Sequence, residues 1–341
     1  MITKRETARQ RPERISVWSE ILRDDKELVL SAVRYDCCAL EHVSLRLRDD
    51  KEVVLTAVEG NGSVLKWASS RLRDDYDVVH AAVVSRGKNR GPHCFTPLEY
   101  ASDRLRDNRE IVEAAVSKIP YGGYAFSLAS ERLRSDKDIA LQAFWRSSEL
   151  KYLKFVSEKL FEDSGFVASF LQRISGRDID LSYFMEHIST KFKCDRDIIL
   201  LAVQKSGYAL EYASTELRGE KEIVMVAVQN QGRALEYASA DLRNDKDIVL
   251  AAIHNDAFSY SFASDELRDN EEVLLEAMSN TLSSSAWNPL KVASERLRDN
   301  KDVVLKAVKL WGMYGLDWAS ERLKKDENLL QIENGVHTGQ R

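Results

Sequence analysis

The sequence has few residues that break helices or form covalent cross-links. Only five prolines occur in 341 residues, which suits a helical chain because proline disrupts a helix interior. The four cysteines show no metal-site spacing, and the adjacent pair Cys37-Cys38 is not a CxxC motif. We therefore expect free thiols in a reducing compartment, with no bound metal and no cofactor.

Long apolar runs and known catalytic motifs are also absent. No run reaches transmembrane length, and the first residues, MITKRETARQRPERIS, lack the apolar core of a signal peptide. P-loop, GxGxxG, HExxH and GxSxG motifs do not occur. The net charge of −5 argues against a surface that binds nucleic acid throughout. These absences predict a cytoplasmic protein without a membrane span, and we expect no enzyme activity.

An internal repeat dominates the sequence. Each copy opens at an anchor residue, usually the leucine of an "LRDD"-like junction. Three successive anchors before the longer middle copies, and four after them, lie 25 residues apart. A small residue lies ten positions after nearly every anchor, and a serine lies three positions before every anchor. Such a period indicates a solenoid. The anchors are Leu22, Leu47, Leu72, Leu105, Leu133, Leu160, Phe192, Leu217, Leu242, Leu267, Leu297 and Leu323.

Each repeat is predicted to contain two helices. The first begins after an Asp or Asn, such as Asp50, Asp245 or Asn300, whose side chain can cap the free N–H groups of the first turn. An apolar run follows, and Gly or Asn closes the helix, as at Gly207 and Gly232. The second helix, ALEYASTEL and its relatives, is short and partly 3₁₀ in character.

The repeats predict an all-α fold, because neither helix buries its apolar side within one repeat. We expect an α-solenoid, right- or left-handed, of about eleven two-helix repeats over residues 15–330. Residues 1–14 are predicted to be a flexible basic arm and residues 331–341 a flexible tail. The eroded sixth repeat suggests a joint between two sub-arrays near residues 161–191.

Extra residues enter the repeats in one phase, between the first and second helix. Loops in one phase of a solenoid project from one side, often the binding side, although drift at tolerant surface loops explains the same pattern. Aromatic and Arg residues commonly anchor protein contacts. The candidate partner-binding residues in these loops are Arg86, Lys88, Arg90, His93, Tyr121 and Tyr124, with a second patch at Trp287, Trp311 and Tyr314.

Three further columns or pairs carry alternative interpretations. The arginines directly after the anchors, such as Arg23 and Arg48, are predicted to pair with acids of the next repeat along one edge. An aromatic column two residues before the serines offers base stacking in a nucleic-acid-binding array, or simply packing. His80 and Glu113 replace an apolar residue in neighbouring repeats, and form either a satisfied polar pair or a cryptic enzyme site.

The repeat resembles a family known as a domain of unknown function, whose pattern is close to LRDDKEVVLxAVxxxGxALEYAS. Copies such as LRDDKEVVLTAVEGNGSVLKWAS and LRDNKDVVLKAV carry this resemblance across nearly the whole chain. It implies an α-solenoid, similar in plan to leucine-rich variant repeats, and it supplies no activity or functional residues. Its occurrence in protists and among Legionella-like effector candidates implies that delivery into a host cell is an alternative to a cytoplasmic location.

The sequence thus favours a non-enzymatic repeat scaffold that binds another protein through its inter-helix loops. The alternatives are a nucleic-acid-binding array on the aromatic column, or an enzyme with a cryptic His80/Glu113 site.

Overall fold

The computed structural model describes residue 16 and residues 19–85, 96–117, 122–145, 150–174, 179–281 and 287–330. Within these residues every regular element is helical, which confirms the predicted all-α repeat fold. None of their helices is long and apolar enough to cross a membrane. The chain divides into two compact units, Met1–Ser175 and Gly176–Arg341. The predicted arm and tail lie outside the described residues.

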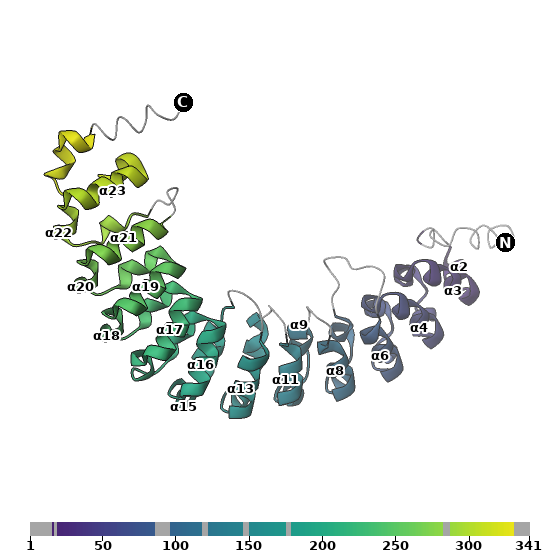
Figure 1. Cartoon of the computed structure of the whole chain (residues 1–341). Helices are drawn as coiled ribbons and strands as arrows, with labels where there is room; N and C mark the ends of the chain where they lie inside the picture. The colour runs from purple at the N-terminus through teal and green to yellow at the C-terminus, as the bar shows by residue number, and fades with distance from the viewer. Residues whose placement is uncertain are drawn as a thin grey trace. The chain divides into compact units, whose positions relative to one another are not determined.

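The first helices of the repeats lie side by side as a row within each unit (Figure 1). Their apolar faces are the core: in α4 (Lys51–Gly60), Val53, Val54, Ala57 and Val58 are all fully buried. The other first helices of the first unit are α3 (Lys26–Tyr35), α6 (Tyr76–Val84), α8 (Arg109–Val116), α11 (Lys137–Ala143) and α13 (Ser164–Arg173). Those of the second unit are α16 (Arg196–Lys205), α17 (Lys221–Asn230), α19 (Lys246–Asn255), α21 (Glu271–Asn280) and α23 (Lys301–Trp311).

The first helices start where the sequence predicts. The side chain of Asp50 accepts hydrogen bonds from the N–H groups of Glu52 and Val53, and Asp245 and Asn300 cap their helices in the same way. The cap satisfies donors that have no partner inside the helix.

The sequence predicts two helices in each repeat, but the predicted second helix is divided into two separate segments. The prediction of a two-helix repeat is corrected accordingly. The first segment is mostly a 3₁₀ helix, namely η2 (Cys37–His42), η4 (Gly62–Trp67), η5 (Pro97–Tyr100), α9 (Gly122–Ser127), η6 (Leu150–Phe155), α14 (Ser182–His187), η7 (Gly207–Tyr212), η9 (Gly232–Tyr237), η10 (Ala257–Phe262), η11 (Pro289–Lys291) and η12 (Gly312–Gly315). The second segment, which we call the junction helix, is a single turn that carries the anchor residue. In the structure each repeat is counted from its first helix to the junction helix that follows it. The junction helices are α2 (Glu20–Arg23), η3 (Leu47–Asp49), α5 (Ser70–Arg73), α7 (Asp103–Arg106), α10 (Glu131–Arg134), α12 (Glu158–Phe161), α15 (Thr190–Lys193), η8 (Leu217–Gly219), α18 (Ala240–Arg243), α20 (Asp265–Arg268), α22 (Glu295–Arg298) and η13 (Leu323–Lys325).

The serine column separates these two segments and joins consecutive repeats. Ser69 Oγ accepts a hydrogen bond from Leu72 N at 3.2 Å, which caps the junction helix, and donates one to Asp49 of the preceding repeat. Ser69 N donates to the Arg48 carbonyl of that repeat at 3.0 Å. Where a junction is complete, as here, one residue makes three hydrogen bonds, which explains why serine recurs where other columns drift.

The arginine that joins the repeats is a different one from the arginine predicted from the sequence. Arg71, directly before its anchor, places Nε 3.0 Å from Asp49 Oδ1. Arg48, directly after its anchor, instead donates through Nε to the Val43 carbonyl of its own repeat at 2.9 Å. Residues two apart in a helix point about 200° apart, so only one of the two arginines faces the preceding repeat. The bridging pairs are Arg46–Asp24, Arg71–Asp49, Arg104–Asp74, Arg132–Asp107, Arg296–Asp269 and Arg322–Asp299.

The glycines after the first helices allow the backbones of neighbouring repeats to approach closely. A Cβ atom on Gly232 would lie 2.4 Å from the Ala252 carbonyl oxygen of the next repeat, and one on Gly62 would lie 2.0 Å from that of Ala82. Neither glycine has a positive φ, so neither is the left-handed helix end that the sequence suggests. The glycine and the small residue of the next repeat therefore set the spacing of the row together.

Candidate binding site on the inter-helix loops

The second unit contains a pocket of about 420 Å³ where its first helices give way to the 3₁₀ helices. We call it the loop pocket. It lies between the first and second helical segments of the repeats, where partner binding is predicted from the sequence. The pocket is lined by Ile179, Asp180, Leu181, Ser182, Ser206, Tyr208, Ala209, Tyr212, Gln231, Gly232, Arg233, Asn255 and Asp256.

Amide side chains from one repeat hold the backbone of the repeat before it around this pocket. Gln231 Oε1 accepts hydrogen bonds from Ser206 Oγ and from Tyr208 N, both at 3.2 Å. Asn255 Oδ1 accepts one from Gly232 N at 2.7 Å, and Asn255 Nδ2 donates to the Gln229 carbonyl at 2.8 Å. These hydrogen bonds fix the pocket wall before any ligand arrives, which lowers the entropic cost of binding.

One rim of the pocket carries a fixed cation. Arg233 Nε lies 2.7 Å from Asp256 Oδ2, and the guanidinium lies 4.6 Å from the centre of the Phe258 ring. The Phe258 ring in turn packs 5.3 Å from the ring of Trp287. The pocket rim is therefore continuous with an aromatic pair that contains one of the predicted partner-binding residues.

Another part of the rim carries the carboxylate of Asp180, which has no basic partner among the described residues. Asp180 Oδ1 accepts a hydrogen bond from Ser182 N at 2.9 Å, and the hydrogen bonds from Ser182 hold the pKa of this exposed carboxyl below its ordinary value. No ion pair joins Asp180 to a basic residue in the part of the chain that is described. Asp180 is therefore ionised at neutral pH and exposed to solvent. Tyr208, which is 40% exposed, lines the same pocket.

The second predicted patch is only partly available to a partner. Tyr314 is 73% exposed, and Asn288 Nδ2 donates to its carbonyl at 3.0 Å, which links it to the segment that begins at Trp287. Trp287 is half-buried. Trp311, however, is only 8% exposed at the end of α23. Its ring packs in the core, because the apolar face of α23 extends to its last residue, so it is not a surface anchor.

The predicted patch in the first unit is represented by Tyr124 alone. This residue is half-buried in α9, and its ring centre lies 5.7 Å from that of Tyr152. Burial, with a smaller contribution from Glu99, raises the pKa of Tyr124 to about 12. Tyr124 is thus largely a packing residue. Arg86, Lys88, Arg90, His93 and Tyr121 lie outside the described residues.

His80 and Glu113 do not form the buried pair that the sequence suggests. Both side chains are half-buried rather than buried. The His80 ring stacks on Tyr76 with centres 5.7 Å apart, and Glu113 Oε1 accepts from Arg109 Nε at 2.6 Å. Each group has a neighbour on its own helix, because residues four apart lie on one face.

The aromatic column is half-buried along most of its length, and cations of the chain lie over several of its rings. Lys66 Nζ lies 4.2 Å from the Trp67 ring centre, and Lys291 Nζ lies 5.3 Å from that of Trp318. A nucleobase would have to displace these cations in order to stack. The column therefore supports packing better than base recognition.

Gln231, Arg233, Asn255 and Asp256 were not among the residues predicted from the sequence. The signal that could have found them is the recurring polar pair directly before the 3₁₀ helix, as in Asn230-Gln231 and Asn255-Asp256. It marks a second place in the repeat, besides the junctions, where polar side chains cross between neighbouring repeats.

Comparison with known proteins identifies the repeat but no activity. The sequence matches the family described as Domain of unknown function (DUF4116) over residues 25–73, 50–83, 181–218, 220–268, 245–285 and 270–324. No curated protein and no solved structure matches the chain. The matched segments together cover more than half of the 341 residues, and they share one stacked architecture of first helix, 3₁₀ helix and junction helix. The chain belongs to the DUF4116 family of repeat proteins.

Proposed function

We propose that the protein is a non-enzymatic scaffold that binds a segment of another protein at the loop pocket. The observation that carries this proposal is the pocket itself, which hydrogen bonds between repeats hold open in the phase where loop lengths vary. Aromatic rings, an Arg–Asp pair and a carboxylate line it. This combination of rigid apolar area and a few polar groups is typical of a recognition site.

The charges of the pocket favour a segment with a basic side chain. Arg233 is already paired with Asp256, whereas Asp180 is ionised without a basic partner among the described residues. A lysine or arginine of the partner would meet this carboxylate and could lie on the exposed face of Tyr208. Trp287 and Phe258 at the other rim would contact apolar residues of the same segment.

The proposal of a scaffold rather than an enzyme rests on the surroundings of His80 and Glu113. Each is engaged by its own helix, so the arrangement offers no general base directed at a substrate. His80→Ala in a folded protein should leave partner binding unchanged. A loss of partner binding in that variant would revive His80 as a functional residue.

The proposed place of action is the cytoplasm, or a host cell if the protein is delivered as an effector. The resemblance to effector candidates is what supports delivery. A translocation reporter fused to the chain with and without residues 320–341 tests it, and equal delivery of both fusions would contradict a signal in that segment.

A random peptide library displayed on phage and selected on the immobilised full chain tests the binding proposal. We expect selected peptides to bind the wild type, and to lose binding to a variant that combines Tyr208→Ala with Asp180→Asn. Tyr35→Ala is the matched control, because it removes an aromatic ring of the first unit that is 69% exposed and does not line the pocket. Circular dichroism should show that all variants are folded.

The outcomes separate the alternatives. Peptides that bind the pocket variant as well as the wild type would place the site elsewhere. Selected peptides without an enriched lysine or arginine would leave the pocket as the site but overturn the role of Asp180. Binding to oligonucleotides that weakens steeply with salt, without peptide binding, would favour the nucleic-acid alternative.

A further inference from the structure

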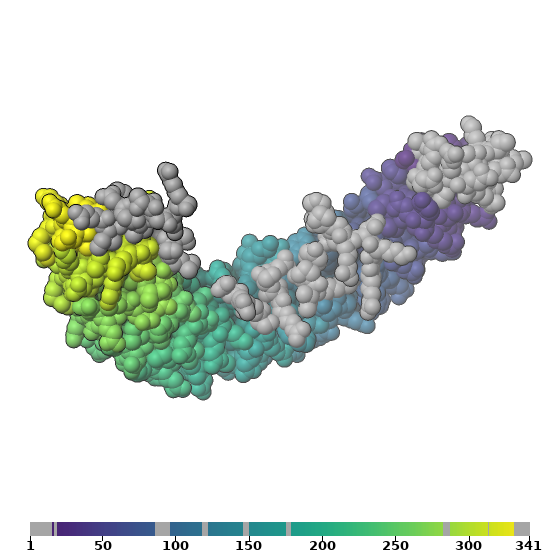
Figure 2. Space-filling model, turned by 45° about the horizontal axis from the view of Figure 1, so that its top comes forward, coloured from purple at the N-terminus to yellow at the C-terminus, as the bar shows by residue number. Residues whose placement is uncertain are grey.

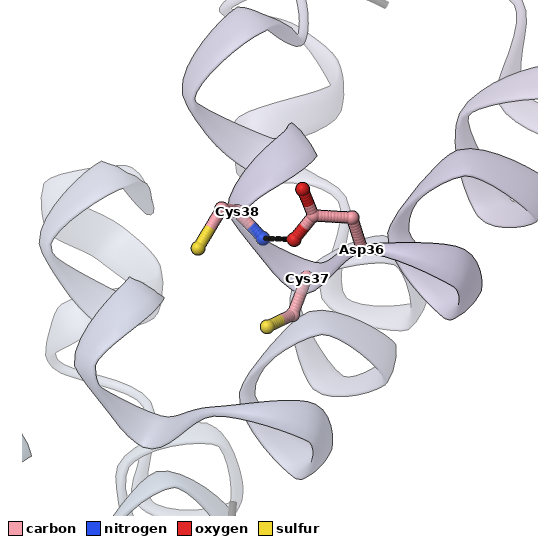
Figure 3. A group of neighbouring side chains, drawn as sticks. All are labelled: Asp36, Cys37 and Cys38. Atoms are coloured by element: carbon pink, nitrogen blue, oxygen red, sulfur yellow. Dashed lines mark hydrogen bonds between the residues drawn. The ribbon is translucent and has the colours of Figure 1, made fainter. Parts of the chain in front are cut away.

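The loop of the first repeat brings two thiols and a carboxylate together. Asp36 connects α3 to η2, which begins with Cys37 and Cys38, and one carboxylate oxygen and both sulfur atoms lie within 4.8 Å of one another. Figure 3 shows the two sulfur atoms on the same side of the loop. Both cysteines are free and half-buried. The three groups are therefore close enough to bind one ion.

Hydrogen bonding and packing hold these side chains in place. Asp36 Oδ1 accepts a hydrogen bond from Cys38 N at 2.9 Å, which fixes the carboxylate at the start of η2. Gly60 of the next repeat leaves room for Cys37, because a Cβ at Gly60 would lie 3.1 Å from Cys37 Cβ. The arrangement thus depends on the stacking of two repeats and is formed before any ion binds.

We propose that Asp36, Cys37 and Cys38 form a binding site for a thiophilic divalent cation, with Zn²⁺ as the physiological candidate. Thiolates select such ions over Mg²⁺ and Ca²⁺. Zinc–sulfur bonds of about 2.3 Å in tetrahedral geometry place two thiolates about 3.8 Å apart, which small side-chain rotations from the observed arrangement can reach. Two sulfur ligands and one oxygen leave a fourth position for water.

The ion would have to displace protons. Burial raises the pKa of the Cys37 thiol to about 11 and also raises that of Cys38. Both thiols are protonated at neutral pH, so binding releases protons and strengthens as the pH rises. The negative charge of Asp36 adjoins the thiols, and Lys66 of the next repeat partly opposes it.

Titration of the reduced, metal-free full chain with Cd²⁺, followed by ultraviolet absorption of the thiolate–metal bond, tests the site directly. We expect one equivalent to bind with a thiolate band. Competition between the protein and a zinc indicator should show that Cys37→Ser or Cys38→Ser weakens Zn²⁺ binding at least tenfold, and Asp36→Asn less. Cys194→Ser, which removes an exposed free thiol, is the control and should bind as the wild type does.

Protection of the thiols in the unmodified chain gives a second readout that does not require the variants to fold. Added Zn²⁺ should slow alkylation of Cys37 and Cys38 and leave that of Cys194 unchanged, as measured by peptide mass spectrometry. Absence of a thiolate band, Zn²⁺ affinity unaffected by both serine variants, or equal alkylation with and without Zn²⁺ would each overturn the proposal.

Discussion

Arg71 Nε lies 3.0 Å from Asp49 Oδ1 and thereby joins one repeat of the first unit to the repeat before it. The same aspartate accepts a hydrogen bond from Ser69. We call this set of Asp, Ser and Arg, repeated along each unit, the junction ladder. Figure 2 shows the repeats of each unit packed into a continuous surface, from purple to teal in the first and from green to yellow in the second. The ladder and the glycine contacts are what hold neighbouring repeats in register.

The ladder predicts that the protein loses stability in acid. The pKa of Asp49 is lowered by the hydrogen bond from Ser69 and then by Arg71. The pKa values of five other ladder aspartates are lowered by the serine and arginine at the equivalent positions of their own junctions. A lowered pKa in the folded state contributes stability that is present above the unfolded pKa of about 3.9 and lost as the pH falls through the folded value. The midpoint of thermal unfolding should therefore be level near neutral pH and fall below about pH 4.

A triple variant provides the control for this pH dependence. Replacing Asp49, Asp74 and Asp107 by Asn keeps an acceptor for each serine and removes the charge. The variant should be less stable than the wild type at neutral pH, and its midpoint should change less between pH 5 and pH 3. Identical pH profiles for the two proteins would show that these carboxylates do not set the acid sensitivity.

Gly232→Ala should destabilise the second unit. Its new Cβ would lie 2.4 Å from the Ala252 carbonyl oxygen and 2.7 Å from Ser259 Oγ, so the two repeats would have to separate. We expect a loss of about 1–3 kcal/mol in the free energy of unfolding, measured by urea denaturation. Gly219→Ala is the matched control, since its Cβ meets nothing closer than Ser239 Oγ at 3.8 Å. A change of about 0.5 kcal/mol or less is expected there.

The ladder can be repaired where the sequence interrupts it. Ser135 occupies the ladder position of its repeat, and the next repeat presents Ser157 and Lys159 at the positions of the usual serine and arginine. The backbone hydrogen bond from Ser157 N to the Arg134 carbonyl is also long, at 3.4 Å. Ser135→Asp should stabilise the first unit by a few tenths to about 1 kcal/mol in thermal or urea unfolding.

Replacement of Ser135 by Asn separates the two contributions to this repair. Asn244 accepts a hydrogen bond from Ser264 at the equivalent position in the second unit, so Ser135→Asn should restore the serine contact without an ion pair. Its effect is expected to lie between the wild type and Ser135→Asp. A destabilised Ser135→Asp variant would indicate that this junction is spaced differently from the others.

Tyr260→Phe tests a buried hydrogen bond in the second unit. Tyr260 is completely buried, and its hydroxyl donates to the Arg268 carbonyl at 2.7 Å. The same carbonyl accepts from Ser294 N at 3.3 Å, so it is not left without a donor. We expect a loss of about 1 kcal/mol in urea unfolding. Tyr314→Phe, at a side chain that is 73% exposed, should have no measurable effect, and equal losses in both would contradict the assignment.

The sequence by itself determined the repeat period, the helical fold and the starts of the first helices. These features depend on local information. Asp50 caps the helix that immediately follows it, and Val53, Val54, Ala57 and Val58 form one apolar face through their spacing alone. A repeated local pattern can only stack on copies of itself, so the architecture followed without coordinates.

Only the tertiary structure decided which side chains meet between repeats. Arg48 and Arg71 are both close to a junction, yet only Arg71 reaches Asp49, because the stacking of the repeats determines which side of a junction helix faces its neighbour. The close approach at Gly232 and the grouping of Asp180 with Tyr208 and Arg233 have the same origin. Residues 20 or more positions apart come together there through packing. A periodic sequence does not specify the rotation and spacing of its own stack.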